Sequence, residues 1–148
     1  MRAIHLLGFL LLAGAAPLAA AVADQIKARQ ANFKQLGRDY KALGDEIKRG
    51  SPNPGIVKAR AAAVAAAASR IPRWFPPGSG PEAGVKTAAK AEIWRRVPDF
   101  KAKAAGLRAE AGKMARLAGG GDRDAMAAQL KAVGARCKAC HTDYREED

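Results

Sequence analysis

Large apolar residues recur every three or four positions along most of this chain, which is the spacing of amphipathic helices. The pattern predicts helices over residues 24–49, 56–70 and 87–118, and a fourth that starts after Asp122, a natural N-cap. Segments rich in Gly and Pro separate them, including a long loop over residues 72–84 that we expect to hold no helix. Pro98 must kink the third helix or lie in its first turn. The fold class predicted is all-α, an antiparallel four-helix bundle.

Composition agrees with a helical domain and narrows the alternatives. Hydrophobic residues make up 49% of the 148 residues but aromatic residues only 5%, because alanine supplies much of the apolar content. A β-sandwich would need more β-branched and aromatic residues, and a disordered chain fewer apolar ones. Alanine also occupies many core positions, and Gly37 and Gly44 lie a heptad apart on the first helix. Such small residues mean either close helix packing or a space reserved for a flat, apolar cofactor.

Residues 1–23 have the pattern of a secretory signal peptide. Arg2 precedes an apolar run, Pro17 interrupts it, and Ala21-Val22-Ala23 offers small residues at the positions that a signal peptidase recognises. We expect cleavage after Ala23, a bundle domain over residues 24–148, and a mature protein in the periplasm with no transmembrane segment. The alternative is an uncleaved membrane anchor, since the uncharged stretch is about long enough to span a bilayer.

The segment Cys137-Lys138-Ala139-Cys140-His141 is a C-x-x-C-H sequence, the attachment motif of c-type haem. Thiols at i and i+3 share one helical face and can add to the two vinyl groups at one edge of a porphyrin. The predicted heptad pattern puts both cysteines on the buried side of the last helix. A zinc site would need a fourth ligand, a thioredoxin-like pair a βαβ context, and a disulfide would close only a tiny loop.

The candidate axial ligands of a haem iron are few. His141 is the one histidine after the leader, so two histidines cannot ligate the iron within one chain. Met126 lies about 22 Å from His141 along the same helix. Met114 is more simply a core residue, and a lysine ligand stays open. The sequence therefore predicts covalent haem c, one per chain, with five-coordinate ferrous iron held by His141.

The C-terminal sequence from Cys137 to Arg145 resembles that of cytochromes c′, the class II c-type cytochromes. The resemblance continues in residues 28–30, in 75–79, and in 92–94 with Phe100. It covers essentially the whole mature chain and implies a dimeric four-helix bundle with a high-spin haem near the C-terminus. Ala91 departs from the proline that relatives often have before Glu-Ile-Trp, and the alignment of Trp74 and Phe75 leaves open which of them enters the pocket.

The resemblance also implies roles for individual residues. Cys137 and Cys140 would hold the haem, and His141 would be the proximal ligand. Arg29 and Gln30 match residues at the haem edge and propionates, and Phe33 matches the residue that faces the iron on the distal side. Arg145 matches a residue that would lie on the proximal side of the haem.

Two functions follow as expectations. One is a haem protein that binds nitric oxide and carbon monoxide, for gas buffering or protection from nitrosative stress, and that is capable of electron transfer. The other is a dedicated electron carrier with a six-coordinate low-spin haem. The net charge of +12 suits an acidic periplasmic redox partner, and export argues against nucleic acid. We expect a homodimer, with alanines of the first two helices at its contact. We expect no enzyme, because no acid–base pair is visible beside the haem.

Overall fold

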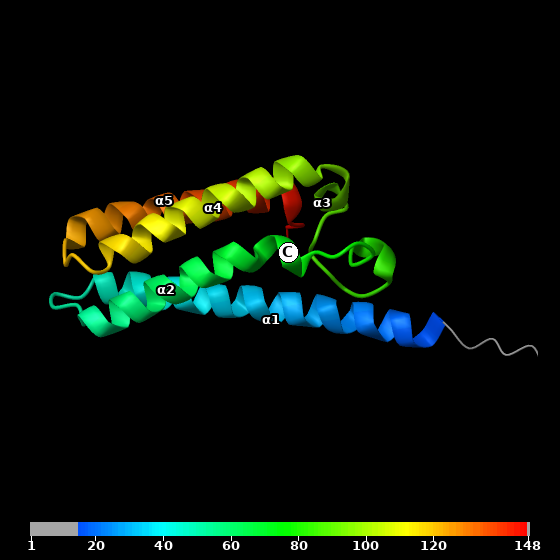
Figure 1. The fold of residues 1–148 in the computed structure, drawn as a ribbon, viewed down its shortest axis with the longest axis horizontal. Helices are drawn as coiled ribbons and strands as arrows, with labels where there is room; N and C mark the ends of the chain where they lie inside the picture. The colour runs from blue at the N-terminus through cyan, green and yellow to red at the C-terminus, as the bar shows by residue number, and fades with distance from the viewer. Residues whose placement is uncertain (1–14, 148) are drawn as a thin grey trace, which may run out of the picture.

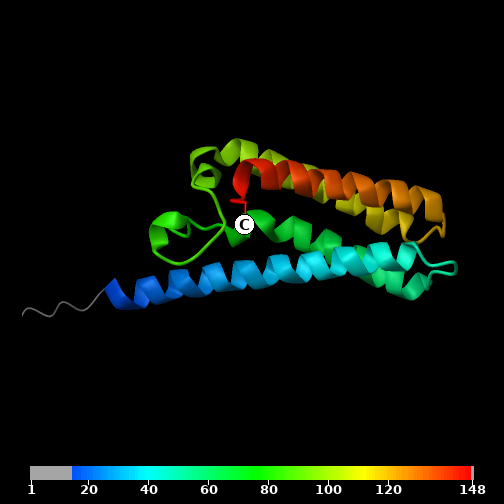
Figure 2. The ribbon, with the colours of Figure 1, turned by 180° about the vertical axis from the view of Figure 1, so that it is seen from behind.

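The structure is a computed structural model that describes the backbone of residues 15–147. Four long helices run antiparallel to their neighbours: α1 (Ala15–Ile47), α2 (Pro54–Arg70), α4 (Val97–Leu117) and α5 (Arg123–Tyr144). The hairpin of α1 and α2 lies against that of α4 and α5, and the short turns of both hairpins lie at the same end (Figure 1). Seen from behind, the long connection from α2 to α4 covers the other end (Figure 2). The predicted four-helix bundle is confirmed.

The ends of α2 and α5 have the expected local chemistry. The Asn53 side chain accepts hydrogen bonds from the backbone amides of Gly55 and Ile56, at 2.9 and 3.2 Å. Asp122 accepts from the amide of Ala125 at 2.9 Å, so the predicted N-cap of the last helix is confirmed. These side chains satisfy amide groups that have no partner within the first turn of a helix.

Two helix boundaries differ from the prediction. The first helix already includes Ala15, the first described residue, and so extends before the predicted start at residue 24, because the alanine-rich sequence favours helix. The predicted third helix, residues 87–118, is two helices, α3 (Glu92–Arg95) and α4, with Arg96 between them in a non-helical conformation. Pro98 lies in the first turn of α4, one of the two places predicted for it.

The segment before α3 is extended because its backbone pairs with the end of α5. Lys90 N donates to Tyr144 O at 3.0 Å, and Glu146 N donates to Ala88 O at 2.8 Å. Ala89 and Arg145 thus form a single antiparallel bridge. The predicted loop over residues 72–84 contains two 3₁₀ turns, η1 (Ile71–Trp74) and η2 (Pro81–Ala83), so the expectation that it holds no helix was too strict.

Polar contacts fix α1 against α2. Arg60 Nη1 lies 2.7 Å from Asp39 Oδ1, and Glu46 Oε1 accepts from the backbone amide of Asn53 at 2.7 Å. Both carboxylates are buried, so each needs a partner.

No helix among the described residues is long and apolar enough to cross a membrane. Residues 1–14 of the predicted leader lie outside the described residues, and nothing in residues 15–147 tests the cleavage after Ala23.

The two small residues of the first helix have different explanations. A Cβ on Gly44 would come within 3.1 Å of Leu130 Cδ2, so Gly44 permits close packing of α1 on α5. Gly37 has no atom within 4 Å of such a Cβ and lines a cavity. Both interpretations left open by the sequence therefore apply, each at one glycine.

Candidate functional site

A cavity of about 590 Å³ lies inside the bundle between α1, α4 and α5. Its walls are mostly apolar side chains of α1, α4 and α5, and the segment before α3 closes one side. The volume is in the range of small-molecule and cofactor sites. All seven predicted site residues line this cavity: Arg29, Gln30, Phe33, Cys137, Cys140, His141 and Arg145.

The two thiols lie one turn apart on α5, and both face the cavity. Each cysteine is half-buried and free of a disulfide, and both pack against the hydrophobic core, on the side of the last helix where they were expected. The cavity leaves them partly open. Burial raises the pKa of the Cys140 thiol to about 11 and that of Cys137 in the same direction. Both are therefore protonated thiols at neutral pH.

His141 follows the second cysteine and lies at the rim of the cavity, exposed on its outer side. Loss of solvation lowers the pKa of its imidazole, and the positive charge of Arg145 lowers it further. The neutral imidazole, which has a free nitrogen lone pair, is thereby favoured. Arg145, also at the rim, is fixed by its backbone amide, which donates to His141 O at 3.0 Å.

Arg29 is a buried cation, 3% exposed, on the cavity wall. Its guanidinium donates to Ser79 Oγ and Ser79 O at 3.0 Å, and to Thr87 Oγ1 at 2.9 Å. It lies over the ring of Phe75, 4.6 Å from the centroid. Among the described residues no carboxylate pairs with it, and desolvation lowers its pKa. The cavity thus contains a positive charge with room for an anionic partner.

Gln30 lies beside Arg29 at the edge of the cavity. Its Nε2 donates to Lys86 O at 2.9 Å, which fixes the segment before α3 to α1. Arg29 makes the same connection through Thr87. The two residues therefore shape one side of the cavity opening.

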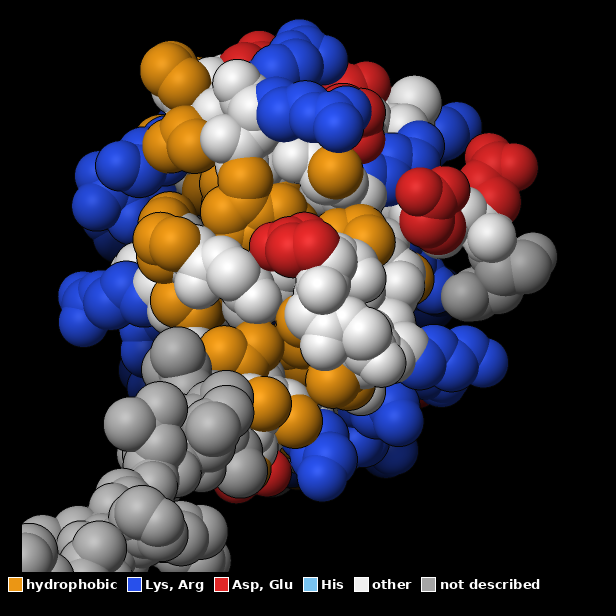
Figure 3. Space-filling model, turned by 90° about the vertical axis from the view of Figure 1, so that its right-hand side faces the viewer, with side chains coloured by type: hydrophobic (Ala, Val, Ile, Leu, Met, Phe, Trp, Pro, Cys, Tyr) orange, Lys and Arg blue, Asp and Glu red, His pale blue; other side chains and the backbone are white. Residues whose placement is uncertain are grey.

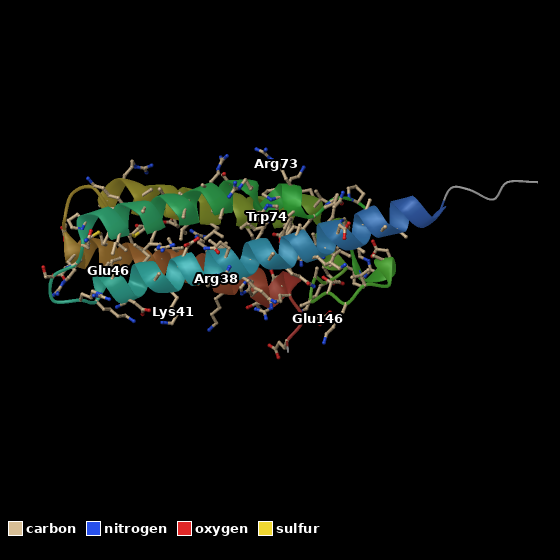
Figure 4. The ribbon with its side chains drawn as sticks, turned by 90° about the horizontal axis from the view of Figure 1, so that it is seen from below. Arg38, Lys41, Glu46, Arg73, Trp74 and Glu146 are labelled. Atoms are coloured by element: carbon tan, nitrogen blue, oxygen red, sulfur yellow. The ribbon has the colours of Figure 1, made fainter. Side chains whose placement is uncertain are left out.

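Aromatic side chains cover the part of the cavity next to η1, where the connection from α2 to α4 begins. Phe33 contacts Trp74 and Phe75 edge-to-face, with ring centroids 5.0 and 6.0 Å apart. Phe75 lines the cavity, whereas Trp74 borders a smaller depression outside it. Figure 4 shows Trp74 beside α1 and Arg73 pointing away from the bundle. The structure therefore assigns the pocket position, left open by the sequence, to Phe75.

The candidate sixth ligands are in different places. Met114 is fully buried in the core and does not line the cavity. Met126 is buried near the opposite end of α5. Lys34 and Lys103 do line the cavity, and Lys103 Nζ is held 2.9 Å from Asp143 Oδ2.

Sequence reasoning missed four polar residues of the site. Ser79 and Thr87 hold Arg29, while Tyr40 and Tyr144 contribute rings to the wall. A spacing of three and four residues can place a tyrosine on the core side of a helix, but it cannot show which core positions border a void. Ser79 and Thr87 lie in irregular segments, where no periodicity applies.

The end of the molecule beside the cavity has apolar side chains over much of its face and basic ones around much of its edge. In the space-filling view, Lys and Arg side chains lie around the hydrophobic ones, and acidic side chains lie near the centre and at the upper right (Figure 3). Such a field attracts anionic molecules.

The fold and the site define a class of protein, the four-helix bundles with a C-x-x-C-H segment facing an internal apolar cavity. Comparison with known proteins gives the family. Residues 24–145 match the family described as Cytochrome C′. This chain belongs to the cytochrome c′ family, whose cofactor is covalently bound haem c.

Individual relatives agree with this assignment. Cytochrome c-556 of Agrobacterium tumefaciens (strain II Chrys) is 38% identical over 125 residues, which are 83% of this chain and 98% of that protein. A cytochrome c′ with ligand-controlled dimer dissociation superposes with a TM-score of 0.78 at 30% identity, covering 85% of this chain and 97% of that one. The nitric oxide complex of a cytochrome c′ variant from Alcaligenes xylosoxidans gives 0.76 at 27% identity, with coverage of 85% and 97%.

The residues present fit haem c. The group is flat and apolar with two carboxylates at one edge, and the cavity is mostly apolar with one buried guanidinium that has only neutral partners. Two thiols lie one turn apart on its wall, and an imidazole lies at its rim.

Proposed function

We propose that this chain is an exported haem c protein that binds nitric oxide and carbon monoxide at five-coordinate, high-spin iron and can also transfer electrons. Cys137 and Cys140 would form the covalent bonds, and His141 would be the axial ligand. When bound, haem c supplies an iron that binds diatomic gases and changes between the ferrous and ferric states. This proposal concerns gas binding and electron transfer and does not include catalysis.

One observation carries the proposal: the cavity wall offers one imidazole and no thioether. Both methionines beyond the leader are buried outside it. The position predicted to face the iron is occupied by Phe33, whose side chain has no atom that can ligate a metal. A diatomic gas would therefore find the distal side without a methionine or a second histidine as ligand.

The remaining residues of the site act by position and charge. Arg29 is prepared for a propionate carboxylate, because its guanidinium is buried and paired only with neutral groups. Phe33, held by Trp74 and Phe75, would shield the distal face and slow an entering ligand. Arg145 favours a neutral His141 by its charge.

The absorption spectrum of the purified protein, ferric and then ferrous, with and without nitric oxide, tests this proposal. We expect high-spin spectra that change when the gas is added. Met114→Leu is the control and should leave the spectra unchanged, because Met114 is remote from the cavity. A low-spin ferrous spectrum that does not respond to the gas would instead support the dedicated electron carrier, with Lys34 or Lys103 as the first ligands to substitute.

We further propose that the mature protein begins at Asp24, resides in the periplasm and forms a homodimer. The family match begins at Asp24, the residue after the expected cleavage site, and a similar structure is described as a dimer that dissociates under ligand control. The mass of the mature protein tests the cleavage. Sedimentation over a concentration series tests the dimer, and monomers at every concentration would contradict it.

The electron-transfer part of the proposal includes an acidic redox partner. The basic edge around the apolar end of the molecule supports it (Figure 3). We expect the rate of electron exchange with an anionic reagent to fall as salt is added, and that with a cationic reagent to rise. The opposite pair of salt effects would contradict the acidic partner.

A further inference from the structure

The chain has two tyrosines, and both line the cavity. Their hydroxyl groups have different acceptors. Tyr40 donates to the backbone carbonyl of Leu130, with 3.0 Å between the oxygens. Tyr144 donates to Oδ2 of the Asp99 carboxylate. This difference determines what each phenol can do when it loses an electron.

A phenol that gives up an electron becomes a strong acid and must release its proton. A carboxylate can take that proton, because it is a base with an ordinary pKa of about 4. An amide carbonyl accepts a hydrogen bond but has no comparable basicity. One-electron oxidation is therefore assisted at Tyr144 and not at Tyr40, although both rings border the same cavity.

The surroundings of Tyr144 suit a transient radical. The residue is 3% exposed, and its ring packs edge-to-face on Phe100, with centroids 5.3 Å apart. Burial and the hydrogen bond to Asp99 raise the pKa of Tyr144 to about 12, so the phenol keeps its proton at neutral pH until an electron leaves. Burial also keeps a radical away from other molecules in solution.

Asp99 connects the buried phenol to solvent. Its side chain is 43% exposed, and Oδ2 lies 3.4 Å from Arg96 Nη2. A proton received from Tyr144 can therefore be passed on to water, and Arg96 keeps the carboxylate beside the tyrosine. Asp99 begins the proton path, and it does not itself line the cavity that Tyr144 borders.

We propose that Tyr144, with Asp99 as its proton acceptor, donates one electron to the haem centre when a hydroperoxide is reduced there. Hydrogen peroxide takes up two electrons and two solvent protons and becomes two water molecules. Of these two electrons Tyr144 would supply one, its phenolic proton passing to Asp99, and bound haem would supply the other. The product is a neutral tyrosyl radical beside a protonated carboxyl group. This further activity rests on the haem occupancy in the proposed function.

Electron paramagnetic resonance of the ferric holoprotein, frozen at short times after mixing with hydrogen peroxide, tests the inference. We expect a tyrosyl signal in the wild type and in Tyr40→Phe, and none in Tyr144→Phe. Asp99→Asn keeps an acceptor for the hydrogen bond but removes the base, so the signal should form about 100-fold more slowly, the size of a typical general-base contribution. Peptide mapping of spin-trap adducts identifies the oxidised residue independently.

Each outcome decides the question. A signal that persists in Tyr144→Phe, a signal lost in Tyr40→Phe, adducts on Trp74 or Trp94 in place of Tyr144, or an unchanged rate in Asp99→Asn would overturn the assignment. The absorption spectrum of each sample, recorded before peroxide is added, separates this failure from that of the proposed function. A chain without haem bands refutes the proposed function, whereas a haem-loaded chain without the Tyr144 radical refutes only this inference.

Discussion

Replacing Phe33 with alanine should speed the binding of carbon monoxide to the ferrous protein. The Phe33 ring packs edge-to-face on Trp74 and on Phe75, and an entering ligand must move the ring away from both. Each such pair is worth about 0.5–1.5 kcal/mol, so the two together add about 1–3 kcal/mol to the barrier. At 1.4 kcal/mol per tenfold change, the alanine variant should bind about 5- to 150-fold faster.

Trp74→Leu provides an intermediate case, because Trp74 borders the outer depression rather than the cavity and its loss removes only one of the two ring pairs. We expect this variant to bind carbon monoxide about 2- to 12-fold faster. Flash photolysis of the carbon monoxide complex measures the association rate directly. Met114→Leu, buried away from the cavity, is the matched control and should keep the wild-type rate.

The predicted order of carbon monoxide association rates, with Phe33→Ala fastest, Trp74→Leu intermediate and the wild type slowest, can be refuted in two ways. If Phe33→Ala binds carbon monoxide no faster than the wild type, the ring does not obstruct the ligand. If Trp74→Leu is faster than Phe33→Ala, the obstruction lies at the tryptophan, and the described ring contacts do not set the barrier.

Three further predictions concern stability and can be measured by denaturant or thermal unfolding. Gly134→Ala should destabilise the protein by about 1–3 kcal/mol, because the new Cβ would lie 2.5 Å from Tyr40 Oη. Gly106→Ala should stabilise the protein by about 0.5–1 kcal/mol, because its Cβ would have no such contact under 3.7 Å. Equal effects of the two substitutions would contradict the packing argument. Asp122→Ala should cost about 1 kcal/mol through loss of the N-cap of α5, and an unchanged unfolding midpoint would count against the cap. The pKa of Tyr144 is raised to about 12 from 10.0, so its neutral form stabilises the fold fully below pH 10, and this contribution is lost as pH rises to 12. Tyr144→Phe should therefore lose less stability between pH 10 and 12 than the wild type does. Parallel losses in the two proteins would argue against the raised pKa.

Much of the fold could be predicted because its signals are local. The three-and-four spacing identified the helices, and breaker residues marked the turns. The start of α3 could not be predicted, because a contact between distant segments decides it: the backbone of Ala88 and Lys90 pairs with the end of α5. A helix would have been the local preference of that segment.

The candidate site likewise combines residues that the local sequence identifies with residues that only contacts between distant segments bring together. Cys137, Cys140 and His141 form a contiguous motif, so their proximity needed no knowledge of the fold. The neutral partners of Arg29 come from Ser79 and Thr87, which are distant in sequence and lie in irregular segments. The choice of Phe75 over Trp74 depends on the 3₁₀ turn η1, whose orientation no periodic pattern encodes.

The bridge between Ala89 and Arg145 affects how this protein should be handled in the laboratory. The backbone of Glu146 is bonded to Ala88, directly beside the residues that close the cavity. An affinity tag joined after Asp148 would start two residues beyond the Glu146 backbone that is bonded to Ala88. Recombinant samples meant for ligand kinetics should carry a cleavable C-terminal tag, removed before measurement, and the rates before and after its removal should be compared.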